Sequence, residues 1–315
     1  MYRIGVDLGG TNIVAGVVDE YYRIVGRGKM PTACPRPSWE IINDLATAIN
    51  MAVEDADISF DDVLSIGIGT PGSVNKRYGV IEYANNLGFD NVPAKDILQS
   101  QFDKPIYLEN DANCAALGEA VAGAGEGVEN FVAVTLGTGV GSGIVINNKI
   151  LNGCNDAAGE MGHTVIEADG EQCTCGRKGC WEAYSSATAL IRQTKEAMGK
   201  NLESAMWTMV DGDINKVDGR TAFNAMRQGD KAGKEVVDNY IHYLGIGLVN
   251  LVNIFQPETL CIGGGIGNER EALLEPLRKI INQEHYSVHS VIQTRLCSAR
   301  LGNDAGVIGA ALLNE

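Results

Sequence analysis

The stretch YRIGVDLGGTNIVAGVV, residues 2–18, decides how the chain begins to fold. Two runs of β-favouring residues, Tyr2–Leu8 and Ile13–Val18, flank the turn Gly9-Gly10-Thr11-Asn12. A short glycine turn between two such runs is typical of a hairpin, and a third run near residues 23–28 adds a neighbouring strand. The sequence therefore predicts a sheet that starts with three antiparallel strands.

The same plan returns in the middle of the chain. Phe131–Leu136 and Val140–Ile146 are again β-favouring runs, and they flank Gly137-Thr138-Gly139. We interpret this echo as two related lobes that face each other. A third glycine cluster, Gly263-Gly264-Gly265, follows the apolar run at residues 259–262.

The remaining segments mix helical and extended patterns, which predicts an α/β protein. Apolar residues at helical spacing favour helices, whereas short apolar runs between turn residues favour strands. The further predicted strands are residues 63–69, 106–109, 259–262 and 291–296. The predicted helices are residues 38–54, 114–122, 183–198, 221–227, 231–255, a segment from about residue 269, and residues 304–313.

The glycine turns expose backbone N–H groups, which suit phosphate oxygens. The hydroxyl of Thr11 or Thr138 could bond a phosphate oxygen, and Asp7 at a strand end could hold a hydrated Mg²⁺. The plainer alternatives are ordinary hairpin turns and a polar strand end. Three such turns, two with a common pattern, favour phosphate binding, although none matches a P-loop or a dinucleotide fingerprint.

A carboxylate stands between two carboxamides where the strand at residues 106–109 stops, in Asn110-Asp111-Ala112-Asn113. Asn and Asp are favoured helix N-caps, so capping alone could explain one of these side chains. The functional interpretation is that Asp111 accepts a hydroxyl proton while Asn110 orients the alcohol. A carboxylate base suits phosphoryl transfer, in which positioning and charge neutralisation dominate.

Residues 159–182 bring metal-binding side chains together in a short loop. One imidazole and three thiolates form the ligand set of a closed structural zinc site. The four candidate ligands are His163, Cys173, Cys175 and Cys180. A disulfide, which needs an oxidising compartment, or a chance cluster of buried cysteines are the alternatives. A nucleic-acid zinc ribbon would add a second cysteine pair and a basic surface, so the spacing favours a structural zinc that also fixes the flanking Glu160 and Glu182.

Charge and composition narrow the range of partners. The chain has 315 residues and a formal net charge of −15, which disfavours nucleic acid and anionic membrane surfaces. Its beginning lacks the pattern of a secretory signal, and no apolar run reaches membrane-spanning length. Five cysteines outside the loop are scattered as reduced thiols would be: Cys34, Cys114, Cys154, Cys261 and Cys297. We therefore expect a cytoplasmic protein of two domains without a nucleic-acid or membrane partner.

These motifs together resemble the ROK family of sugar kinases and repressors over nearly the whole chain. Residues 7–12 resemble the family's first phosphate motif and residues 136–143 its second, and residues 263–265 stand where the family contacts adenosine. Asn110-Asp111 matches its sugar-binding Asn and its catalytic Asp. The most specific signature is the segment from Glu160 to His163 with the spaced cysteines and Glu182.

The resemblance implies an actin-like fold with two ribonuclease-H-like lobes and a cleft between them. We expect the lobes at residues 1–112 and 113–302, with the zinc loop at 159–182 in the second and a closing helix at 303–315 that packs back on the first. It further implies that ATP is held by Asp7 (through a hydrated Mg²⁺), Gly9, Gly10, Thr11, Asn12, Gly137, Thr138, Gly139, Gly264 and Gly265. It implies that the sugar is held by Gly72, Asn86, Asn110, Asp111, Glu160, His163 and Glu182, and that His163 also ligates zinc.

Within the family, the residues favour a glucose kinase. The first strand begins at Tyr2, so we expect no DNA-binding helix-turn-helix of the kind that ROK repressors carry before it. Ser73 stands where N-acetylmannosamine kinases of the family look to have an arginine, and Asn86-Leu87-Gly88-Phe89 resembles the Asn-Leu-Gly-Trp of the glucose kinases.

The expected reaction is phosphorylation of the 6-hydroxyl of glucose by ATP, with Asp111 as general base. The resemblance also implies a homodimer or tetramer. A kinase for N-acetylglucosamine, N-acetylmannosamine, fructose or allose, polyphosphate as an alternative donor, and a sugar-responsive regulator without catalysis are the alternatives.

Overall fold

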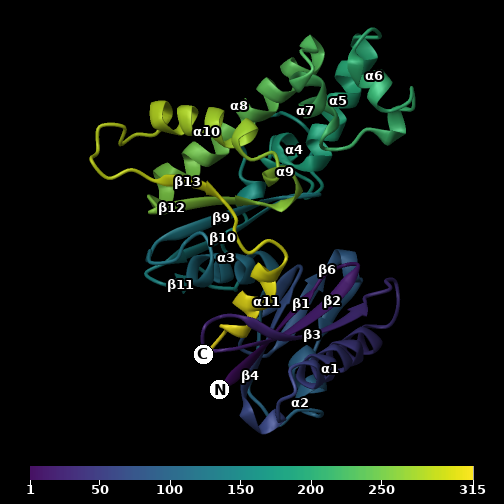
Figure 1. Cartoon of the computed structure of the whole chain (residues 1–315), viewed down its shortest axis with the longest axis vertical. Helices are drawn as coiled ribbons and strands as arrows, with labels where there is room; N and C mark the ends of the chain where they lie inside the picture. The colour runs from purple at the N-terminus through teal and green to yellow at the C-terminus, as the bar shows by residue number, and fades with distance from the viewer. Residues whose placement is uncertain (315) are drawn as a thin grey trace. The chain divides into compact units, whose positions relative to one another are not determined.

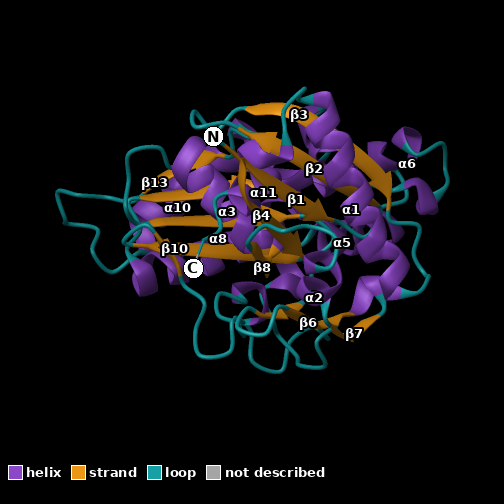
Figure 2. Ribbon diagram, turned by 90° about the horizontal axis from the view of Figure 1, so that it is seen from below, coloured by secondary structure: helices purple, strands orange, loops and turns teal. Residues whose placement is uncertain are grey.

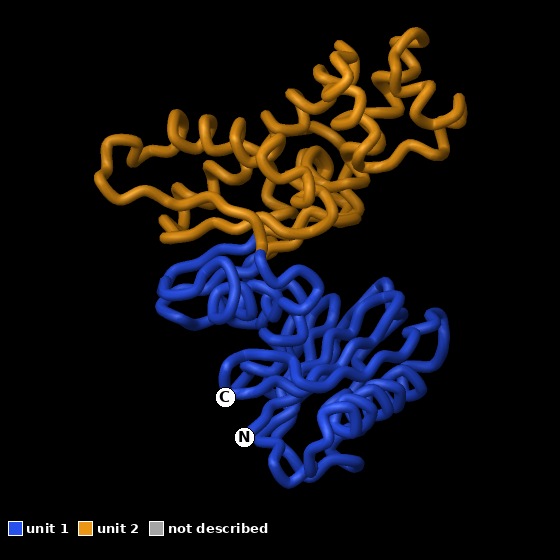
Figure 3. Tube along the Cα trace, in the orientation of Figure 1, with its two compact units in different colours: residues 1–133, 143–159, 300–315 blue, residues 134–142, 160–299 orange. Residues whose placement is uncertain are grey.

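The structure, a computed structural model, describes residues 1–314 and divides into two compact units (Figure 3). Unit 1 comprises residues 1–133 and 143–159 and the chain from residue 300 onward, and unit 2 comprises residues 134–142 and 160–299. Residues 113–133, 143–159 and 300–302, which we expected in the second lobe, thus group with the N-terminal unit.

The first sheet has five strands in the order β3-β2-β1-β4-β8 (Figure 2). β1 (Tyr2–Leu8), β2 (Asn12–Val18) and β3 (Ile24–Pro31) are antiparallel neighbours, which confirms the predicted start of the sheet. β4 (Val63–Thr70) and β8 (Ile106–Asn110) run parallel to β1. Because parallel strands end at one edge, the carboxyl ends of β1, β4 and β8 bring Asp7, Thr70 and Asn110 to the same side of this sheet.

Glycines let two helices lie close to this sheet, one on each face. Gly28 of β3 faces α1 (Ser38–Asp55), where an added Cβ would lie 1.9 Å from the Ala48 carbonyl oxygen. Gly28 pairs with Ala15 of β2, so the next residue, Gly16, points to the opposite face of the sheet. There a Cβ added to Gly16 would lie 2.6 Å from the Val307 side chain of α11 (Asp304–Ala311). α11 therefore packs on the sheet of unit 1, as Figure 1 shows.

A small three-stranded sheet in unit 1 was missed by the sequence reasoning. β5 (Ser73–Asn75), β6 (Val80–Ala84) and β7 (Phe89–Val92) are antiparallel, and a 3₁₀ turn at Asn85–Leu87 joins the last two. Strands of three to five residues are too short to show a clear alternation, which explains the miss. Helix α2 (Ala94–Gln99) follows, and then the chain enters β8.

The second five-stranded sheet has the order β11-β10-β9-β12-β13. Its strands are β9 (Phe131–Leu136), β10 (Val140–Ile146), β11 (Lys149–Ile150), β12 (Thr259–Gly263) and β13 (Arg295–Ser298). The order matches that of the first sheet strand for strand, with a glycine turn joining β9 to β10 as another joins β1 to β2. The echo read from the sequence is therefore confirmed in the topology.

The helices of unit 2 follow the predictions in most places. α7 (Thr221–Arg227) and α8 (Lys231–Phe255) begin and end where the spacing placed them. The segment expected as one helix at 183–198 is two, α4 (Glu182–Ser185) and α5 (Ala187–Lys200), because Ser186 is extended and caps α5. The unit also contains α6 (Ala205–Met209), α9 (Gly264–Gly267) and α10 (Glu271–Glu284).

The last strand was wrongly predicted at its start. Val291 and Ile292 belong to the loop between α10 and β13, and both side chains project into solvent with exposed fractions of 100 % and 81 %. β-branched residues favour strands only where a neighbouring strand or face covers them, and here none of the described residues does so. Among residues 1–314, no helix combines the length and apolarity that crossing a membrane requires.

Candidate functional site

Asn110 ends β8 and caps α3 (Asp111–Ala122), so the capping interpretation of this motif is confirmed. Its side-chain oxygen accepts from the N–H groups of Ala112 at 2.9 Å and Asn113 at 3.3 Å. Its Nδ2 donates to the carbonyl of Gly72 at 3.1 Å. Gly72 has φ +88°, and an added Cβ would lie 1.9 Å from the Tyr83 carbonyl oxygen, so only glycine fits there. Asn110 thus fixes both the helix start and the loop before β5.

Asp111 is the first residue of α3 and is half-buried. Burial raises the pKa of its carboxyl, and the Ala112 N–H, which donates to it at 2.8 Å, opposes that shift. A raised pKa gives a carboxylate a stronger affinity for a proton, which suits a general base.

Asp7, one residue before the end of β1, lies near Asp111 in unit 1. Burial raises the pKa of Asp7 to about 6, and the negative charge of Asp111 adds to the shift. A cation between two such carboxylates would relieve both desolvation and repulsion. The pair fits Mg²⁺, which takes one or two carboxylates together with water and phosphate oxygens.

The sequence reasoning missed a buried polar network around Glu109, where β8 meets α3. Glu109 is fully buried, and its carboxylate accepts three hydrogen bonds. The donors are the ammonium of Lys76 at 2.6 Å, the side-chain amide of Asn113 at 3.0 Å and the backbone N–H of Asn110 at 2.9 Å. The amide of Asn152, oriented to satisfy both neighbours, donates to Glu109 at 3.1 Å and accepts from Lys76 at 2.8 Å. The one signal in the sequence is a charged residue inside an otherwise apolar strand. We call Glu109, Lys76, Asn110, Asn113 and Asn152 the corner network.

The first glycine turn lies beside the candidate sugar residues of unit 1. Gly10, Thr11 and Asn12 are exposed, and the Gly9 N–H closes the turn on the Asn12 carbonyl at 2.9 Å. A Cβ added to Gly10 would lie 3.4 Å from the side-chain nitrogen of Asn86. The structure therefore places the turn next to the 3₁₀ segment that carries Asn86.

The second and third glycine turns are neighbours in unit 2. The Gly137 N–H donates to the Gly139 carbonyl at 3.0 Å, which leaves Thr138 exposed at the tip. Gly264 starts α9 with φ +80°, and an added Cβ would lie 2.5 Å from the Leu136 carbonyl oxygen. Gly264 thus lies directly beside the strand end that leads into the turn, and the exposed Gly265 follows it.

The four candidate metal ligands come together. Their ligand atoms all lie within 4.8 Å of one another, with 3.6 Å between the Sγ atoms of Cys175 and Cys180 and 3.6 Å between Cys173 Sγ and His163 Nδ1. Tetrahedral ligands at zinc bond lengths are separated by about 3.5–3.8 Å, so the set fits zinc. All eight cysteines are free, and the sulfur separation here is far longer than a disulfide bond.

The thiols themselves point to a cation. Burial raises the pKa of Cys180 to about 12, so without a metal this sulfur would hold its proton at neutral pH. The backbone N–H of Arg177 lowers the pKa of Cys175. Zinc binds thiolates and displaces their protons, so the ion would satisfy the two buried sulfurs, Cys173 and Cys180, together with the exposed Cys175.

Glu182 connects the metal loop to the second glycine turn. Its Oε2 accepts from the Val140 N–H at 2.9 Å, and its Oε1 accepts from the Thr174 hydroxyl at 3.3 Å. Glu160 is exposed at the start of the 3₁₀ turn Met161–His163. Both carboxylates therefore lie at the metal loop, and their expected contact with sugar hydroxyls stays a prediction.

The core side of the loop is anchored by Trp181, which follows the last cysteine and is fully buried. Its indole packs on Gly247 of α8, where an added Cβ would come within 2.0 Å, and its Nε1 donates to the Tyr243 carbonyl at 3.1 Å. Burying a tryptophan against a glycine fixes the direction in which the chain leaves the metal cluster.

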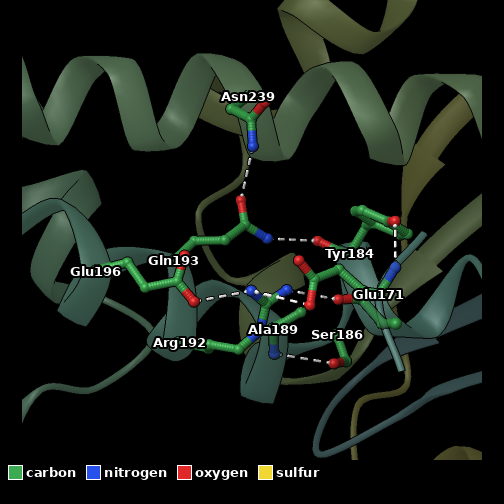
Figure 4. Close-up of polar contacts among 9 residues, drawn as sticks. Glu171, Tyr184, Ser186, Ala189, Arg192, Gln193, Glu196 and Asn239 are labelled. Carbon is green, nitrogen blue, oxygen red and sulfur yellow. Dashed lines mark hydrogen bonds and ion pairs between the residues drawn. The ribbon is translucent and has the colours of Figure 1, made fainter. Parts of the chain in front are cut away.

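Polar contacts hold the outer part of the loop against α4 and α5 (Figure 4). The Glu171 N–H donates to the Tyr184 hydroxyl at 2.7 Å, and Arg192 lies 3.5 Å from the Glu171 carboxylate. Gln193 donates to the Tyr184 carbonyl and accepts from Asn239 of α8, both at 2.9 Å. The exposed ion pair between Arg192 and Glu171 contributes little stability, so the buried Trp181 is the stronger of these anchors.

Comparison with known proteins decides the family. The ROK family profile matches residues 3–315. The chain belongs to the ROK family. A glucokinase of Halalkalibacterium halodurans is 38 % identical over 99 % of this chain and 94 % of its own. A xylose repressor of Caldicellulosiruptor bescii is 32 % identical over 97 % of this chain and 76 % of its own.

The fold agrees with that of solved ROK proteins. The crystal structure of a ROK family glucokinase from Streptomyces griseus in complex with glucose and AMPPNP superimposes with a TM-score of 0.82. The two chains are 36 % identical, and the match covers 99 % of this chain and 98 % of the other. The two-lobe α/β fold implied by the resemblance is therefore confirmed.

In this ROK protein the candidate residues form one group in each unit. The group in unit 1 consists of Asp7, Gly9, Gly10, Thr11, Asn12, Gly72, Asn86, Asn110 and Asp111. The group in unit 2 consists of Gly137, Thr138, Gly139, Glu160, His163, Cys173, Cys175, Cys180, Glu182, Gly264 and Gly265. Unit 1 carries the candidate base and the first glycine turn, and unit 2 carries the metal loop and the other two glycine turns.

Proposed function

We propose that the protein transfers the γ-phosphoryl group of ATP to the 6-hydroxyl of glucose. The observation that carries the proposal is Asp111, a half-buried carboxylate of raised pKa at a capped strand end, in a chain similar over its full length to glucokinases. A base at this place and glycine turns in both units are the parts that phosphoryl transfer requires.

The proposed reaction proceeds in line. Asp111 accepts the proton of the 6-hydroxyl while that oxygen forms a bond to the γ-phosphorus, and the bond to the bridging oxygen of ADP breaks. Asn86 and Asn110 orient the sugar together with Gly72 in unit 1, and Glu160, His163 and Glu182 contribute from unit 2. The amides of the glycine turns stabilise the negative charge on the phosphate oxygens.

Two metal ions have separate proposed roles. Asp7 would hold a hydrated Mg²⁺, and such an ion would offset negative charge on the phosphates; the raised pKa of Asp7, which a nearby cation would relieve, supports this role. Zinc on His163 and the three cysteines is structural, because four protein ligands leave no open position. His163 Nδ1 lies on the side of Cys173, so Nε2 is the nitrogen available to a sugar hydroxyl.

A regulator without catalysis is the rival from another class, since xylose repressors are also relatives. A regulator has no use for a base, so the raised pKa of the Asp111 carboxyl and the nearby Asp7 favour the kinase. A kinase releases ADP from ATP only when sugar is present, whereas a regulator without catalysis releases none, so an assay for ADP with and without sugar separates the two possibilities. A homodimer or tetramer in the cytoplasm stays a prediction.

The experiment that tests the function is a panel of sugars at fixed ATP, read by a coupled assay for ADP. We expect glucose to give the highest kcat/KM among glucose, N-acetylglucosamine, N-acetylmannosamine, fructose and allose. Asp111→Asn should lower kcat by about 10³-fold or more while glucose still binds, because its amide cannot take the proton. No turnover with any sugar would refute the kinase, near-normal turnover of Asp111→Asn would refute the base, and a preference for another hexose would correct the substrate.

A further inference from the structure

Thr32 lies outside every motif, yet it holds the first glycine turn. Its hydroxyl donates to the carbonyl of Gly9 at 2.6 Å, and its N–H donates to the carbonyl of Thr11 at 2.9 Å. The side chain is fully buried, and the Thr32 carbonyl in turn accepts from Arg36 at 2.8 Å. Thr32, directly after β3, therefore fixes two carbonyls of the first glycine turn.

The second glycine turn is held in the same way by the start of α5. The Ala187 N–H donates to the carbonyl of Gly137 at 2.8 Å, and the Thr188 hydroxyl donates to the carbonyl of Thr138 at 2.8 Å. These contacts also give a partner to the first N–H of α5, which has none within the helix. In both units, one backbone N–H and one threonine hydroxyl bind two carbonyls of a glycine turn.

A hydrogen bond that fixes a backbone carbonyl also fixes the direction of the N–H group in the same peptide. In a trans peptide the C=O and the following N–H point in opposite directions, and the peptides of both turns are trans. The contacts of Thr32 therefore direct the N–H groups of Gly10 and Asn12 away from Thr32. The contacts at α5 direct the N–H groups of Thr138 and Gly139 away from the helix.

We propose that Thr32 and Thr188 are positioning residues that aim the amides of the two glycine turns at the phosphates of the nucleotide. This inference rests on the proposed function, since it takes ATP as the ligand of the turns. Preformed amides need no reorientation when negative charge arrives, which is the source of their effect on phosphate binding. Neither threonine touches the nucleotide in this scheme, so both act through the turn.

The two threonines differ in burial, and that difference sets the expected order of effects. Thr32 is fully buried, so without its hydroxyl the Gly9 carbonyl would lose its donor where water cannot easily replace it. Thr188 is exposed, so water can reach the Thr138 carbonyl. Loss of the Thr32 hydroxyl should therefore affect the turn more than loss of the Thr188 hydroxyl.

The test uses valine, which keeps the shape and removes the hydroxyl, and serine, which keeps the hydroxyl. We expect Thr32→Val to raise KM for ATP about tenfold and Thr188→Val about threefold, as the loss of one neutral hydrogen bond in each environment implies. The serine variants should stay within about twofold of the parent. Thr194→Val is the matched control, because this buried hydroxyl donates to the Leu190 carbonyl within α5.

Two further binding constants distinguish a specific effect on the amides that bind phosphate from a general loss of structure. The Kd for glucose, measured without nucleotide by calorimetry, and the Ki of adenosine against ATP should stay unchanged in both valine variants. The Thr194→Val control should leave all three constants unchanged. Thr188 is exposed, so Thr188→Val keeps the test informative if Thr32→Val fails to fold.

Three results would overturn the inference: an unchanged KM for ATP in Thr188→Val and Thr32→Val, a parallel loss of adenosine affinity, or serine variants as impaired as valine variants. Each of these presupposes a parent enzyme that turns over ATP. Absence of turnover in the parent would instead refute the proposed function, so the two failures are distinct.

Discussion

The corner network in unit 1 and the metal loop at residues 159–182 in unit 2 both hold candidate catalytic or binding residues, but by different means. At the corner, the buried Glu109 is satisfied by donors of the chain itself, foremost Lys76 at 2.6 Å. In the loop, the thiols of Cys175 and Cys180 lie 3.6 Å apart, and Cys180 Sγ also lies 3.6 Å from the His163 carbonyl oxygen, with no positively charged group among residues 1–314 to balance a thiolate at Cys180. The first arrangement is complete once the chain folds, whereas the second is complete only with a cation.

This difference explains why both arrangements can occur in one chain. A base must keep its geometry under all conditions, so a network fixed by chain donors suits Asp111. The loop is rich in glycine and has few apolar side chains apart from Trp181, so a metal supplies the order that a core would otherwise provide. The comparison therefore predicts that the two regions respond independently to different perturbations.

Removal of zinc should have the largest effect, and only in the loop. We expect 1,10-phenanthroline to raise amide hydrogen exchange in residues 159–182 by about 10²-fold or more, because the three thiols lose the ion that keeps them ionised. Residues 106–122 should keep their protection. Exchange measured by mass spectrometry with and without chelator checks this.

A matched variant sharpens the zinc prediction. Cys175→Ser removes the exposed ligand without opening a core cavity, and it should reproduce the effect of the chelator at residues 159–182. Equal loss of protection at residues 106–122 would contradict the independence of the two regions. Unchanged exchange in the loop, with zinc shown absent by metal analysis, would contradict its dependence on metal.

A substitution in the corner network should have an effect of intermediate size, confined to unit 1. Lys76→Met leaves the Glu109 carboxylate buried without its cation, which typically costs about 3–5 kcal/mol. We expect a clearly lower Tm and a fall in kcat, because Asn110 and Asp111 follow directly on Glu109. Zinc content should stay at one ion per chain.

The double variant Lys76→Met/Glu109→Gln is the control for the corner. Its neutral amide can still bond to Asn113 and Asn152, so it should recover much of the lost stability relative to Lys76→Met. Thermal unfolding of the two single variants and the double variant gives the coupling. Additive losses would mean that Lys76 and Glu109 do not stabilise the corner as a pair.

The extent to which sequence predicted these regions follows from the range of the contacts. The glycine turns, the capping Asn110 and the four metal ligands were found because each depends on residues close in sequence. Thr32 reaches a turn that is 23 residues away, and Lys76 reaches a carboxylate 33 residues away. A lone threonine or lysine carries no local pattern, so contacts of this kind appear only once the sheets are assembled.

The same reason explains the errors in secondary structure. β5–β7 are short strands that form through mutual pairing in unit 1, whereas Val291 and Ile292 have β-favouring side chains without a neighbouring strand. Long periodic helices such as α8 were found to the residue because the apolar spacing along 25 residues is itself the signal.

The smallest expected effect is a gain in stability from Asp7→Asn. The pKa of Asp7 is about 6 in the folded chain against an ordinary 3.8, so the folded state binds an extra proton between these values. Below pH 3.8 both states are protonated and the group contributes nothing, whereas above pH 6 its ionised form destabilises the fold fully. Asp7→Asn removes that cost, so the free energy of unfolding should rise by about 1–3 kcal/mol at pH 7.5.

The gain should shrink as the pH falls from 6 towards 4, and it should accompany a loss of kcat, since Mg²⁺ loses its proposed ligand. Chemical unfolding of Asp7→Asn and the parent at several pH values, without Mg²⁺ or nucleotide, measures the difference. A gain that grows towards low pH has the wrong sign for a raised carboxyl pKa and would contradict the account. If the predicted sign holds, unit 1 keeps a destabilising carboxylate at Asp7, whereas zinc would offset most of the negative charge of the three thiolates in the metal loop.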